Sequence, residues 1–312
     1  IVLITGPTAV GKTDVACALA DLLGGNDGVS LISVDSAMVY RGMDIGSAKP
    51  TAEERRHYPH ALIDIREPED TYTAADFVAD ADNCINEAFS ANRLPVLVGG
   101  TMLYAKRFVE GIANLPGADP QLRASLTAAY EREGGTVLHA QLAALDPAAA
   151  ANIHPNNPQR LLRALEVVRV TGRPMSDQWQ ELNGPSAVER LAAEVAVYAI
   201  LPQDRQQLHE RIARRFDAML AAGFEAELEG LRARPGFSPE LPAMRAVGYR
   251  QGFAYLAGEL DAQAFREQAI VATRRLAKRQ LTWLRRWPDL QRMPAAQPMR
   301  LARSIAQELG VD

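Results

Sequence analysis

Eight residues near the start of the sequence have the types and the spacing of a phosphate-binding loop. The two glycines of the pattern Gly-x-x-x-x-Gly-Lys-Thr let the backbone curl so that successive N–H groups point inward. Lys12 supplies a positive charge, and the hydroxyl of Thr13 is placed to hold a Mg²⁺ ion. The pattern predicts a site for a phosphate or a pyrophosphate, without saying which. The eight residues are Gly6, Pro7, Thr8, Ala9, Val10, Gly11, Lys12 and Thr13.

An aspartate, Asp35, follows the apolar run 31–34 and opens a loop that extends to residue 50 with little periodicity. Loops of this length are usually functional. A carboxylate beside a phosphate site can accept a proton from a nucleophile, or bind a metal ion through water. We favour a general base for Asp35, ahead of a place in a metal shell and of a structural cap.

The segments around these residues alternate between strand patterns and helix patterns. Strands are predicted at 1–5, 30–34, 61–65 and 95–98, and helices at about 12–23, 73–91 and 101–109. This alternation indicates a parallel sheet with ligands outside the carboxyl ends of its strands. The phosphate-binding loop, Asp35 and the turn Gly99-Gly100-Thr101 each follow a strand, so we expect them to meet at one edge. An ordinary glycine-containing turn at 6–13 is the disfavoured alternative.

The rest of the chain is predicted to be mainly helical. Residues 119–190 have the pattern of an α-helical insertion, and a strand at 195–201 then returns to the sheet. Helices follow at about 204–222, 224–233, 245–257, 261–286 and 298–309. We therefore divide the chain into a core (1–118), the insertion (119–190) and a return to the core (191–312). The predicted class is α/β, a P-loop NTPase-like parallel sheet of the nucleoside-kinase type with a helical insertion and C-terminal helices.

The net charge of −4 hides an uneven distribution. Residues 245–303 contain 12 Lys and Arg but only 4 Asp and Glu, which favours selective contact with a polyanion. No stretch approaches the roughly 18 apolar residues that span a bilayer. The chain starts inside a predicted strand without a Met, so we expect upstream residues and leave a targeting segment in them open. Cys17 and Cys84 lack metal-ligand and redox spacing and are expected to be buried free thiols of an intracellular protein.

The stretch 274–286 of the helix predicted at 261–286 carries much of this positive charge. Its basic residues recur near helical spacing, as in a helix that buries one side and offers the other to phosphates. An ordinary solvated helix face is the alternative. Trp283 and Trp287 are expected in the core rather than as platforms for stacked bases.

Several motifs, in order from residue 1 to about 287, together resemble the bacterial tRNA dimethylallyltransferases. The sequence departs from the usual pattern at Val10, where the family commonly has Ser. It departs again at Ala37-Met38, where many members have Met-Gln, which leaves side-chain contacts from those two positions open. The motifs are the loop 6–13, DS at 35–36, YRGMDIG at 40–46 with AKP at 48–50, PHALID at 59–64, VGGTMLY at 98–104, PQRLLRALE at 158–166, VGYR at 247–250 and RLAKRQ at 275–280.

The resemblance implies transfer of the five-carbon dimethylallyl group from dimethylallyl diphosphate to N6 of an adenine. That adenine lies just 3′ of the anticodon in tRNAs that read codons beginning with U. Lys12 and a Mg²⁺ ion on Thr13 would stabilise the leaving pyrophosphate, and Asp35 would take the proton of the amine. Thr101 would aim the nucleophile, with a helix N-cap as the alternative or additional role. Arg215 is implied as a diphosphate ligand, and a solvated helix face is its alternative.

The resemblance also implies contacts with the anticodon stem-loop of tRNA, which the helical insertion would clamp. Gln159 is a candidate for reading a base edge, and the arginines are expected on phosphates. Reaching N6 requires the adenine to turn out of the stacked loop into a protein channel. The implied tRNA contacts are Asp35, Ser36, Ala37, Met38, Thr101, Arg123, Gln159, Arg160, Leu161, Leu162, Arg163, Arg245, Gly248, Tyr249, Arg250, Arg275, Lys278, Arg279 and Gln280.

We expect a cytoplasmic, monomeric enzyme without membrane contact. The main alternative is a P-loop kinase that phosphorylates a small metabolite with ATP. The basic segment and the long chain beyond a kinase-like core disfavour it. An RNA-binding protein with a nucleotide-switch domain, and an enzyme of the plant type that prenylates free adenine nucleotides, are further alternatives.

Overall fold

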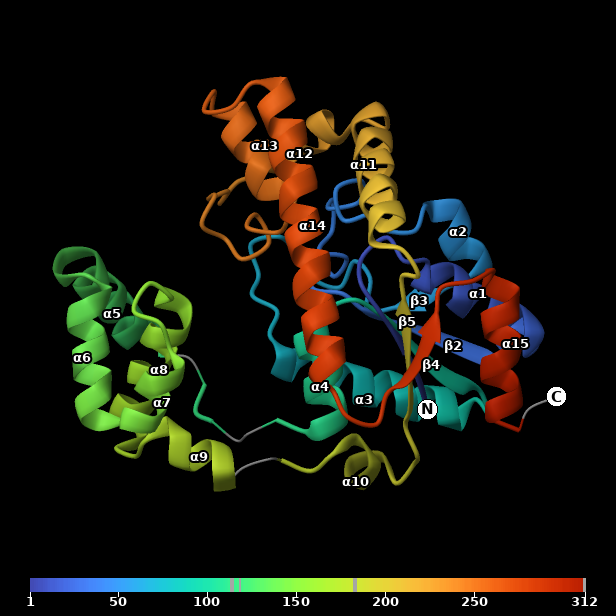
Figure 1. Ribbon diagram of the computed structural model, residues 1–312, viewed down its shortest axis with the longest axis horizontal. Helices are drawn as coiled ribbons and strands as arrows, with labels where there is room; N and C mark the ends of the chain where they lie inside the picture. Colours follow the sequence, from blue (N-terminus) through green and yellow to red (C-terminus); the bar gives the residue numbers. More distant parts are fainter. Residues whose placement is uncertain (113–114, 118, 182–183, 311–312) are drawn as a thin grey trace. The chain divides into compact units, whose positions relative to one another are not determined.

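The computed structural model describes residues 1–112, 115–117, 119–181 and 184–310 of the chain. They form two compact units, drawn in Figure 1. The first unit comprises Ile1–Val109 and Ala187–Asp312, and the second comprises Glu110–Ser186. The units divide at 109/110 and 186/187, whereas we placed the sequence boundaries at 118/119 and 190/191.

In the described part of the first unit, six parallel strands form one sheet in the order β3-β2-β4-β1-β5-β6. The four inner strands are mostly apolar and buried, as is usual for parallel strands covered on both faces. The predicted α/β class with a parallel sheet is confirmed. The strands are β1 (Val2–Thr5), β2 (Val29–Val34), β3 (His60–Ala61), β4 (Leu94–Gly99), β5 (Ala196–Leu201) and β6 (Gln291–Pro294).

Some elements differ from the sequence prediction. The strand predicted at 61–65 is only His60–Ala61, because Leu62 and Asp64 adopt positive φ angles of 63° and 55°, outside the strand region. The helix predicted from about 245 begins at Tyr249, after Gly248 with a φ of 93°. Three short elements were not predicted: strand β6, helix α2 (Ala52–His57) and the 3₁₀ helix η1 (Gly25–Asp27).

Helices cover both faces of the sheet. On one face, α1 (Lys12–Leu22) and α15 (Pro298–Glu308) share an apolar core, to which Leu19 and Ile305 contribute. Leu97 of β4 lies on the opposite face of the sheet, and it is also fully buried, so that face is covered as well. The opposite face is covered by α3 (Ala74–Ser90), which packs against β2 and β4, and β4 leads into α4 (Met102–Glu110).

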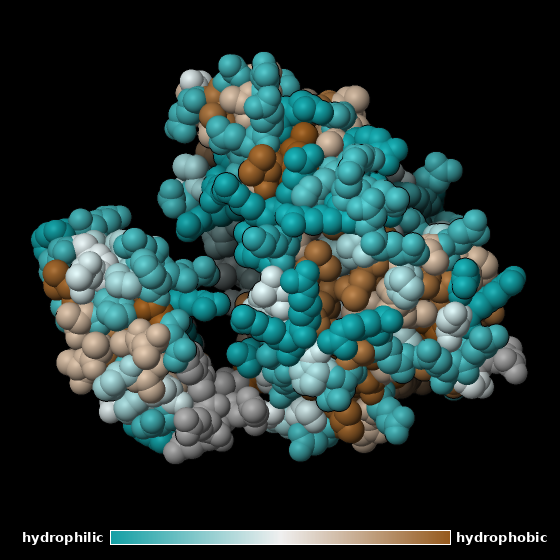
Figure 2. All heavy atoms as spheres, in the orientation of Figure 1, coloured by the Kyte–Doolittle hydropathy of each residue, from teal (hydrophilic) through white to brown (hydrophobic). Residues whose placement is uncertain are grey.

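Of the four helices that directly follow β5, three gather beyond one end of the strands in Figure 1, and the last runs on from there toward α4. Aromatic contacts join them: the rings of Phe216 and Phe265 have centroids 5.6 Å apart, and those of Phe224 and Tyr249 are 5.2 Å apart. Hydrophilic residues predominate on their visible surface in Figure 2. They are α11 (Arg205–Ala221), α12 (Phe224–Arg232), α13 (Tyr249–Leu256) and α14 (Ala262–Arg286).

The second unit is helical and has an apolar core of its own, built on residues such as Leu138, Leu142, Leu161 and Leu165. Fully buried Asp146 caps one of its helices by accepting the N–H of Ala149, and it also binds Ser176. The helices are α5 (Pro120–Glu133), α6 (Gly135–Leu145), α7 (Pro147–Asn152), α8 (Pro158–Thr171) and α9 (Met175–Glu181), and α10 (Ala187–Leu191) follows in the first unit.

Candidate active site

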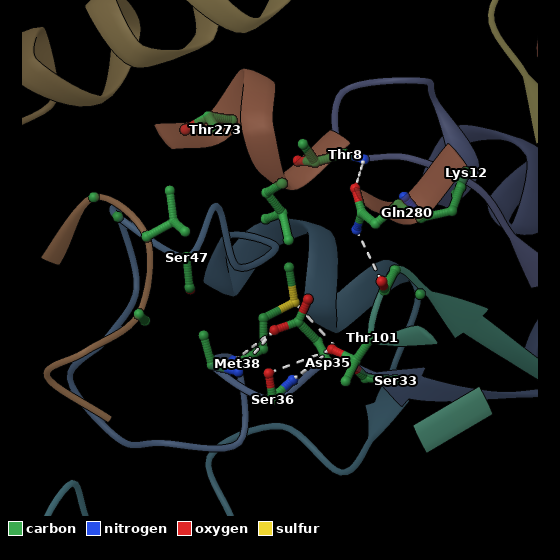
Figure 3. A pocket seen from close by; sticks show the side chains of 18 of the residues that line it. Thr8, Lys12, Ser33, Asp35, Ser36, Met38, Ser47, Thr101, Thr273 and Gln280 are labelled. Atoms are coloured by element: carbon green, nitrogen blue, oxygen red, sulfur yellow. Dashed lines mark hydrogen bonds between the residues drawn. The ribbon is translucent and has the colours of Figure 1, made fainter. Parts of the chain in front are cut away.

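A cavity of about 510 Å³ lies in the first unit, where the predicted chemical groups meet. Lys12 and Thr13 of the phosphate-binding loop line it, with Asp35 after β2 and Thr101 after β4. Arg215 of α11 lines it as well. Figure 3 shows Asp35 beside Thr101, and Lys12 near a glutamine of α14. Two cations and a carboxylate therefore share one cavity.

The phosphate-binding loop has the tight backbone that its glycines permit. A Cβ on Gly6 would lie 2.5 Å from the carbonyl oxygen of Ile200 in β5, so no side chain fits there. Gly11 has a φ of 99° and precedes α1 without a side-chain cap. The N–H groups of the first helical turn are then available to an anion, which the helix dipole also favours. Val10, where the family has Ser, is buried beside Gly6.

A second cavity, of about 630 Å³, borders the same loop. Lys12, Thr13 and Arg215 line both cavities, whereas Arg211 and Arg214 line only the second. Arg214 is exposed, while Arg215 is half-buried. Of the two neighbouring arginines, it is therefore Arg215 that reaches the cavity with Asp35.

Two cations are held close together at this loop. Burial, together with the nearby charge of Arg215, lowers the pKa of Lys12 to about 8, and the charge of Asp35 opposes the shift. Burial also lowers the pKa of Arg215, and this is opposed by Asp35 and Asp14. The Lys12 Nζ donates a hydrogen bond to the Pro7 carbonyl at 2.8 Å. Two partly desolvated cations favour an anion with several charges, such as a pyrophosphate.

Asp35 is oriented by its own loop. Its Oδ1 accepts the backbone N–H groups of Ala37 at 2.8 Å and of Met38 at 3.2 Å. These bonds fix the carboxylate and use one oxygen, so Oδ2 is the atom with capacity to accept a proton. The local cap that we considered for Asp35 is thus present, and it is compatible with a chemical role.

Thr101 is bound to the loop that follows β2. Its Oγ1 accepts the N–H of Ser36 at 3.1 Å and donates to the Ser36 Oγ at 3.4 Å, while its own N–H donates to Val34 at 3.2 Å. The ends of β2 and β4 are therefore joined directly beside Asp35. The roles of Asp35, Thr101, Lys12 and Arg215 in catalysis stay predictions.

Buried Lys49 holds the loop 36–50 from within. Its Nζ donates to the Tyr40 carbonyl at 2.8 Å, to Asp44 at 2.5 Å and to Asp64 at 2.6 Å. Asp64 also binds Arg55. The Lys49 side chain is 1% exposed, whereas the side chains of Asp44 and Asp64 are 56% and 27% exposed. A buried ammonium group is costly without such partners, so these contacts favour one arrangement of the loop. Residues of the motifs at 40–50 and 59–64 thus bind one another and hold the loop in shape.

Glu227 of α12 is a supporting residue that the sequence analysis missed. Its carboxylate accepts the backbone N–H groups of Asp44, Ile45 and Gly46 at 2.9, 2.6 and 3.1 Å, and the Tyr249 hydroxyl at 2.6 Å. Gly46 lines the cavity and has no room for a Cβ, which would lie 2.2 Å from the Phe224 ring. A glutamate on a helix with several others gives no signal of this role in the sequence.

The oxygen donors of the site suit a hard divalent cation. The Thr13 hydroxyl is exposed at the loop, and Asp35 keeps one free oxygen nearby. Within the described ranges there is no group of three or more His, Cys, Asp and Glu that could enclose a metal. Mg²⁺ commonly binds through one or two protein oxygens, water and substrate phosphates, so these residues fit it.

Several implied tRNA contacts of the first unit are buried. Tyr249 is fully buried and Gly248 is buried, and both line the cavity. These two residues therefore cannot belong to an RNA-binding surface on the outside of the protein. Gln280 is 5% exposed. Ala37 and Met38 are half-buried and line the cavity. The exposed members of the set are Ser36, Arg245, Arg250, Arg275, Lys278 and Arg279.

The implied contacts in the second unit also divide by burial. Gln159 and Arg160 are exposed, and Leu162 is half-buried. Leu161 is fully buried in the core of the unit, so its side chain cannot contact RNA as the resemblance implied.

Arg123 and Arg163 both bind the buried carboxylate of Glu166, at 2.7 and 2.9 Å. Arg163 also donates to the Pro116 carbonyl at 2.7 Å. The Arg123–Glu166 pair joins α5 to α8, whereas the Arg163–Glu166 pair lies within α8. Phosphate binding by either arginine is an additional role and stays a prediction.

Two other sequence expectations need correction. Trp287 is in the core as predicted, but Trp283 is 36% exposed, lines the cavity and has the Lys106 Nζ 5.8 Å from its ring centroid. Cys17 and Cys84 are free but half-buried rather than buried. Burial is the main cause that raises their pKa values, to about 12 and about 11, so both thiols are protonated at neutral pH.

A family model described as IPP transferase matches residues 38–287 of this chain. The chain belongs to the IPP transferase family. The tRNA dimethylallyltransferase of Chromohalobacter salexigens is 54% identical over 285 residues, 91% of this chain and 89% of that protein. The enzyme of the same name from Ralstonia pickettii is 52% identical, over 91% of this chain and 87% of that protein.

A solved family member has the same fold. The tRNA isopentenylpyrophosphate transferase of Bacillus halodurans is 36% identical, with a TM-score of 0.69, over 99% of this chain and 96% of that one. A search of the described helices finds none long and apolar enough to cross a membrane. The family resemblance stated from the motifs is thus confirmed.

Proposed function

We propose that this protein transfers the dimethylallyl group of dimethylallyl diphosphate to N6 of the adenine 3′-adjacent to the anticodon, in tRNAs reading UNN codons. One observation carries the proposal: a fixed carboxylate, Asp35, lines the same cavity as the cations Lys12 and Arg215. In a family whose similar members are named for this reaction, the cations suit the leaving pyrophosphate and the carboxylate suits the amine.

The residues account for each part of the displacement. N6 of adenine attacks C1 of the dimethylallyl group, the C1–O bond breaks, and the electron pair leaves with pyrophosphate. Lys12, Arg215 and the N–H groups of the loop stabilise the charge that develops on the pyrophosphate, usually the largest catalytic contribution. Oδ2 of Asp35 takes the proton that N6 loses. Ser36 and Thr101 hold the ends of β2 and β4 together, which keeps the base in place.

A divalent metal ion, which we propose to be Mg²⁺, belongs at the hydroxyl of Thr13. Bound there with the diphosphate, it would neutralise part of the negative charge of the leaving group. Thr13 and one oxygen of Asp35 are the protein atoms available to it. Because Asp35 would serve either as a base or in the metal shell, the two roles need an experiment that separates them.

The acceptor is proposed to be the anticodon stem-loop of tRNA. The exposed residues Arg275, Lys278 and Arg279 on α14 suit its phosphates. We propose exposed Gln159 and Arg160 on α8 as further tRNA contacts. Turning the adenine out of its stack costs a few kcal/mol, which these contacts would offset. We propose that the protein acts as a monomer, and we propose a cytoplasmic location, where tRNA is modified.

The proposal is tested by offering the protein two donors separately. With dimethylallyl diphosphate and unmodified tRNA we expect a prenylated tRNA and released pyrophosphate. With ATP and small phosphate acceptors we expect no phosphoryl transfer. Phosphoryl transfer without prenylation would favour the kinase alternative, and efficient prenylation of free AMP would favour the nucleotide-prenylating type.

The pKa of Lys12 predicts a pH dependence. The charged lysine binds the diphosphate, so kcat/KM for dimethylallyl diphosphate should fall as the pH rises through about 8, where free-enzyme Lys12 loses its proton. Below pH 8 the lysine is charged and this contribution is complete. Lys12→Arg keeps the charge to higher pH, so its profile should lack the decline near 8. The same decline in both proteins would assign it to another group.

The exposed face of α14 predicts a change in salt dependence. The double charge reversal Lys278→Glu with Arg279→Glu should weaken tRNA binding and make the plot of log K against log salt less steep. Each lost phosphate contact reduces the slope by about 0.7 to 0.9. Arg56→Glu, an exposed charge reversal on α2, is the control and should leave the slope unchanged. An unchanged slope for the α14 variant would mean that this face does not bind phosphate.

A further inference from the structure

Gln280 of α14 joins two loops of the site through one buried side chain. Its Oε1 accepts the backbone N–H of Thr8 at 2.9 Å, and its Nε2 donates to the Gly100 carbonyl at 2.8 Å. Figure 3 shows the amide between these two partners. Thr8 belongs to the phosphate-binding loop after β1, and Gly100 belongs to the turn after β4 that carries Thr101. The donor side and the acceptor side of the cavity are thus tied to the same amide.

The fit around this amide is tight. A Cβ on Gly100 would lie 2.7 Å from the Nε2 of Gln280 and 3.4 Å from the Nζ of Lys12. Because Gly100 has no side chain, the backbone of the turn can lie directly against the side chains of Gln280 and Lys12. A change in the amide would move this turn relative to Lys12, and Thr101 with it.

The amide has little capacity left for another partner. Gln280 is 5% exposed, and both ends of its amide are used within the protein. On the same helix, Lys278 and Arg279 are exposed. On helix α14 the charged side chains of Lys278 and Arg279 thus face outward, and the amide of Gln280 faces inward. An RNA bound to the outer face would not contact Gln280. The N–H of Thr8 is also committed to Gln280 and is not donated to a phosphate.

We infer that Gln280 is a positioning residue: it sets the spacing between the pyrophosphate-binding loop and the acceptor-side turn, and is not itself a tRNA contact. The inference rests on the proposed function for the identity of the two substrates. Its physical basis is that the transfer requires the leaving group, C1 and N6 in one line. A displacement of about 1 Å at such a site can cost on the order of 100-fold in rate.

Gln280→Met tests the inference, because methionine has a similar length but neither hydrogen-bonding group. We expect kcat at saturating substrates to fall about 10- to 100-fold, with the Kd for tRNA changed less than about 2-fold. Gln280→Glu keeps an acceptor for Thr8 but places a negative oxygen against the Gly100 carbonyl. Its kcat should fall at least as far, and its KM for dimethylallyl diphosphate should rise. Gln268→Met, an exposed change on the same helix, is the control and should match the unchanged protein.

A change in tRNA affinity without a change in kcat would overturn the inference. If Gln280→Met weakens tRNA binding 10-fold or more while kcat is unchanged, Gln280 is a tRNA contact. Gln280→Asn, which is too short to reach both partners, gives the same test should the methionine variant not fold.

Calorimetric binding of inorganic pyrophosphate separates this inference from the proposed function, since it needs no tRNA. We expect weaker binding to Gln280→Met than to Gln268→Met, by several-fold. Equal affinities would contradict the positioning of the loop by Gln280, whatever reaction the unchanged protein performs. Failure of the unchanged protein to prenylate tRNA, with weaker pyrophosphate binding in Gln280→Met, would remove only the proposed function.

Discussion

Replacing Asp35 with asparagine is expected to lower the turnover number about 10²- to 10⁴-fold, the usual contribution of a positioned acid or base. Asparagine has nearly the same shape, and its Oδ1 can still accept the N–H groups of Ala37 and Met38 that Asp35 binds. The local loop structure should therefore be kept while the proton acceptor is lost. Single-turnover prenylation of tRNA measures the effect, and affinity for tRNA should change little.

Two comparisons separate the roles considered for Asp35. If it serves mainly in a metal shell, a higher Mg²⁺ concentration should restore much of the activity of Asp35→Asn; as a general base, it should not be rescued. If it were only a cap, Asp35→Asn would be nearly fully active and Asp35→Ala impaired. Full activity in both variants would remove Asp35 from the mechanism.

Replacing Lys12 with alanine is expected to reduce kcat/KM for dimethylallyl diphosphate about 10²- to 10³-fold, as removal of one preorganised charge from a transition state commonly does. Lys12 lies beside Arg215 at the helix terminus, so the loss should also weaken binding of inorganic pyrophosphate. Steady-state kinetics at varied diphosphate, with saturating tRNA, measure the first effect, and calorimetry measures the second.

The matched control removes a cation elsewhere on the first unit. Arg56→Ala on the exposed side of α2 should leave both quantities unchanged. Lys12→Arg should recover part of the activity near pH 7, because it keeps a charge with a different shape. Unchanged kinetics in Lys12→Ala would separate the loop from the pyrophosphate and contradict the assignment of the donor site.

The parts of the site that could be predicted are those whose signal is local in sequence. The strand, glycine-rich loop and helix around Lys12 form a contiguous pattern, and Asp35 and Thr101 each follow an apolar strand. Parallel strands bring their carboxyl ends together, so the strand pattern was enough to predict that these segments meet. Helices α11 and α14 were evident from their apolar periodicity.

The parts that could not be predicted depend on contacts between distant segments. Glu227 meets the backbone N–H groups of Asp44 to Gly46 across about 180 positions, and no pattern around Glu227 indicates this. Leu161 and Tyr249 were taken from family motifs as RNA contacts, yet both side chains are fully buried: Leu161 packs in the core of the second unit, and Tyr249 donates to Glu227. Trp283 is of a residue type that is usually expected in a core, but it lines the cavity and is 36% exposed.

The most direct test of the central claim is to identify the nucleoside that the protein makes. Unmodified tRNA reading a UNN codon is incubated with dimethylallyl diphosphate, Mg²⁺ and the protein, then digested and analysed by mass spectrometry. We predict N6-(dimethylallyl)adenosine only at the adenine 3′-adjacent to the anticodon, with one pyrophosphate released per group transferred, and no product from tRNA with guanine at that position. Release of pyrophosphate without a modified adenosine, or modification equally spread over other adenines, would contradict the account.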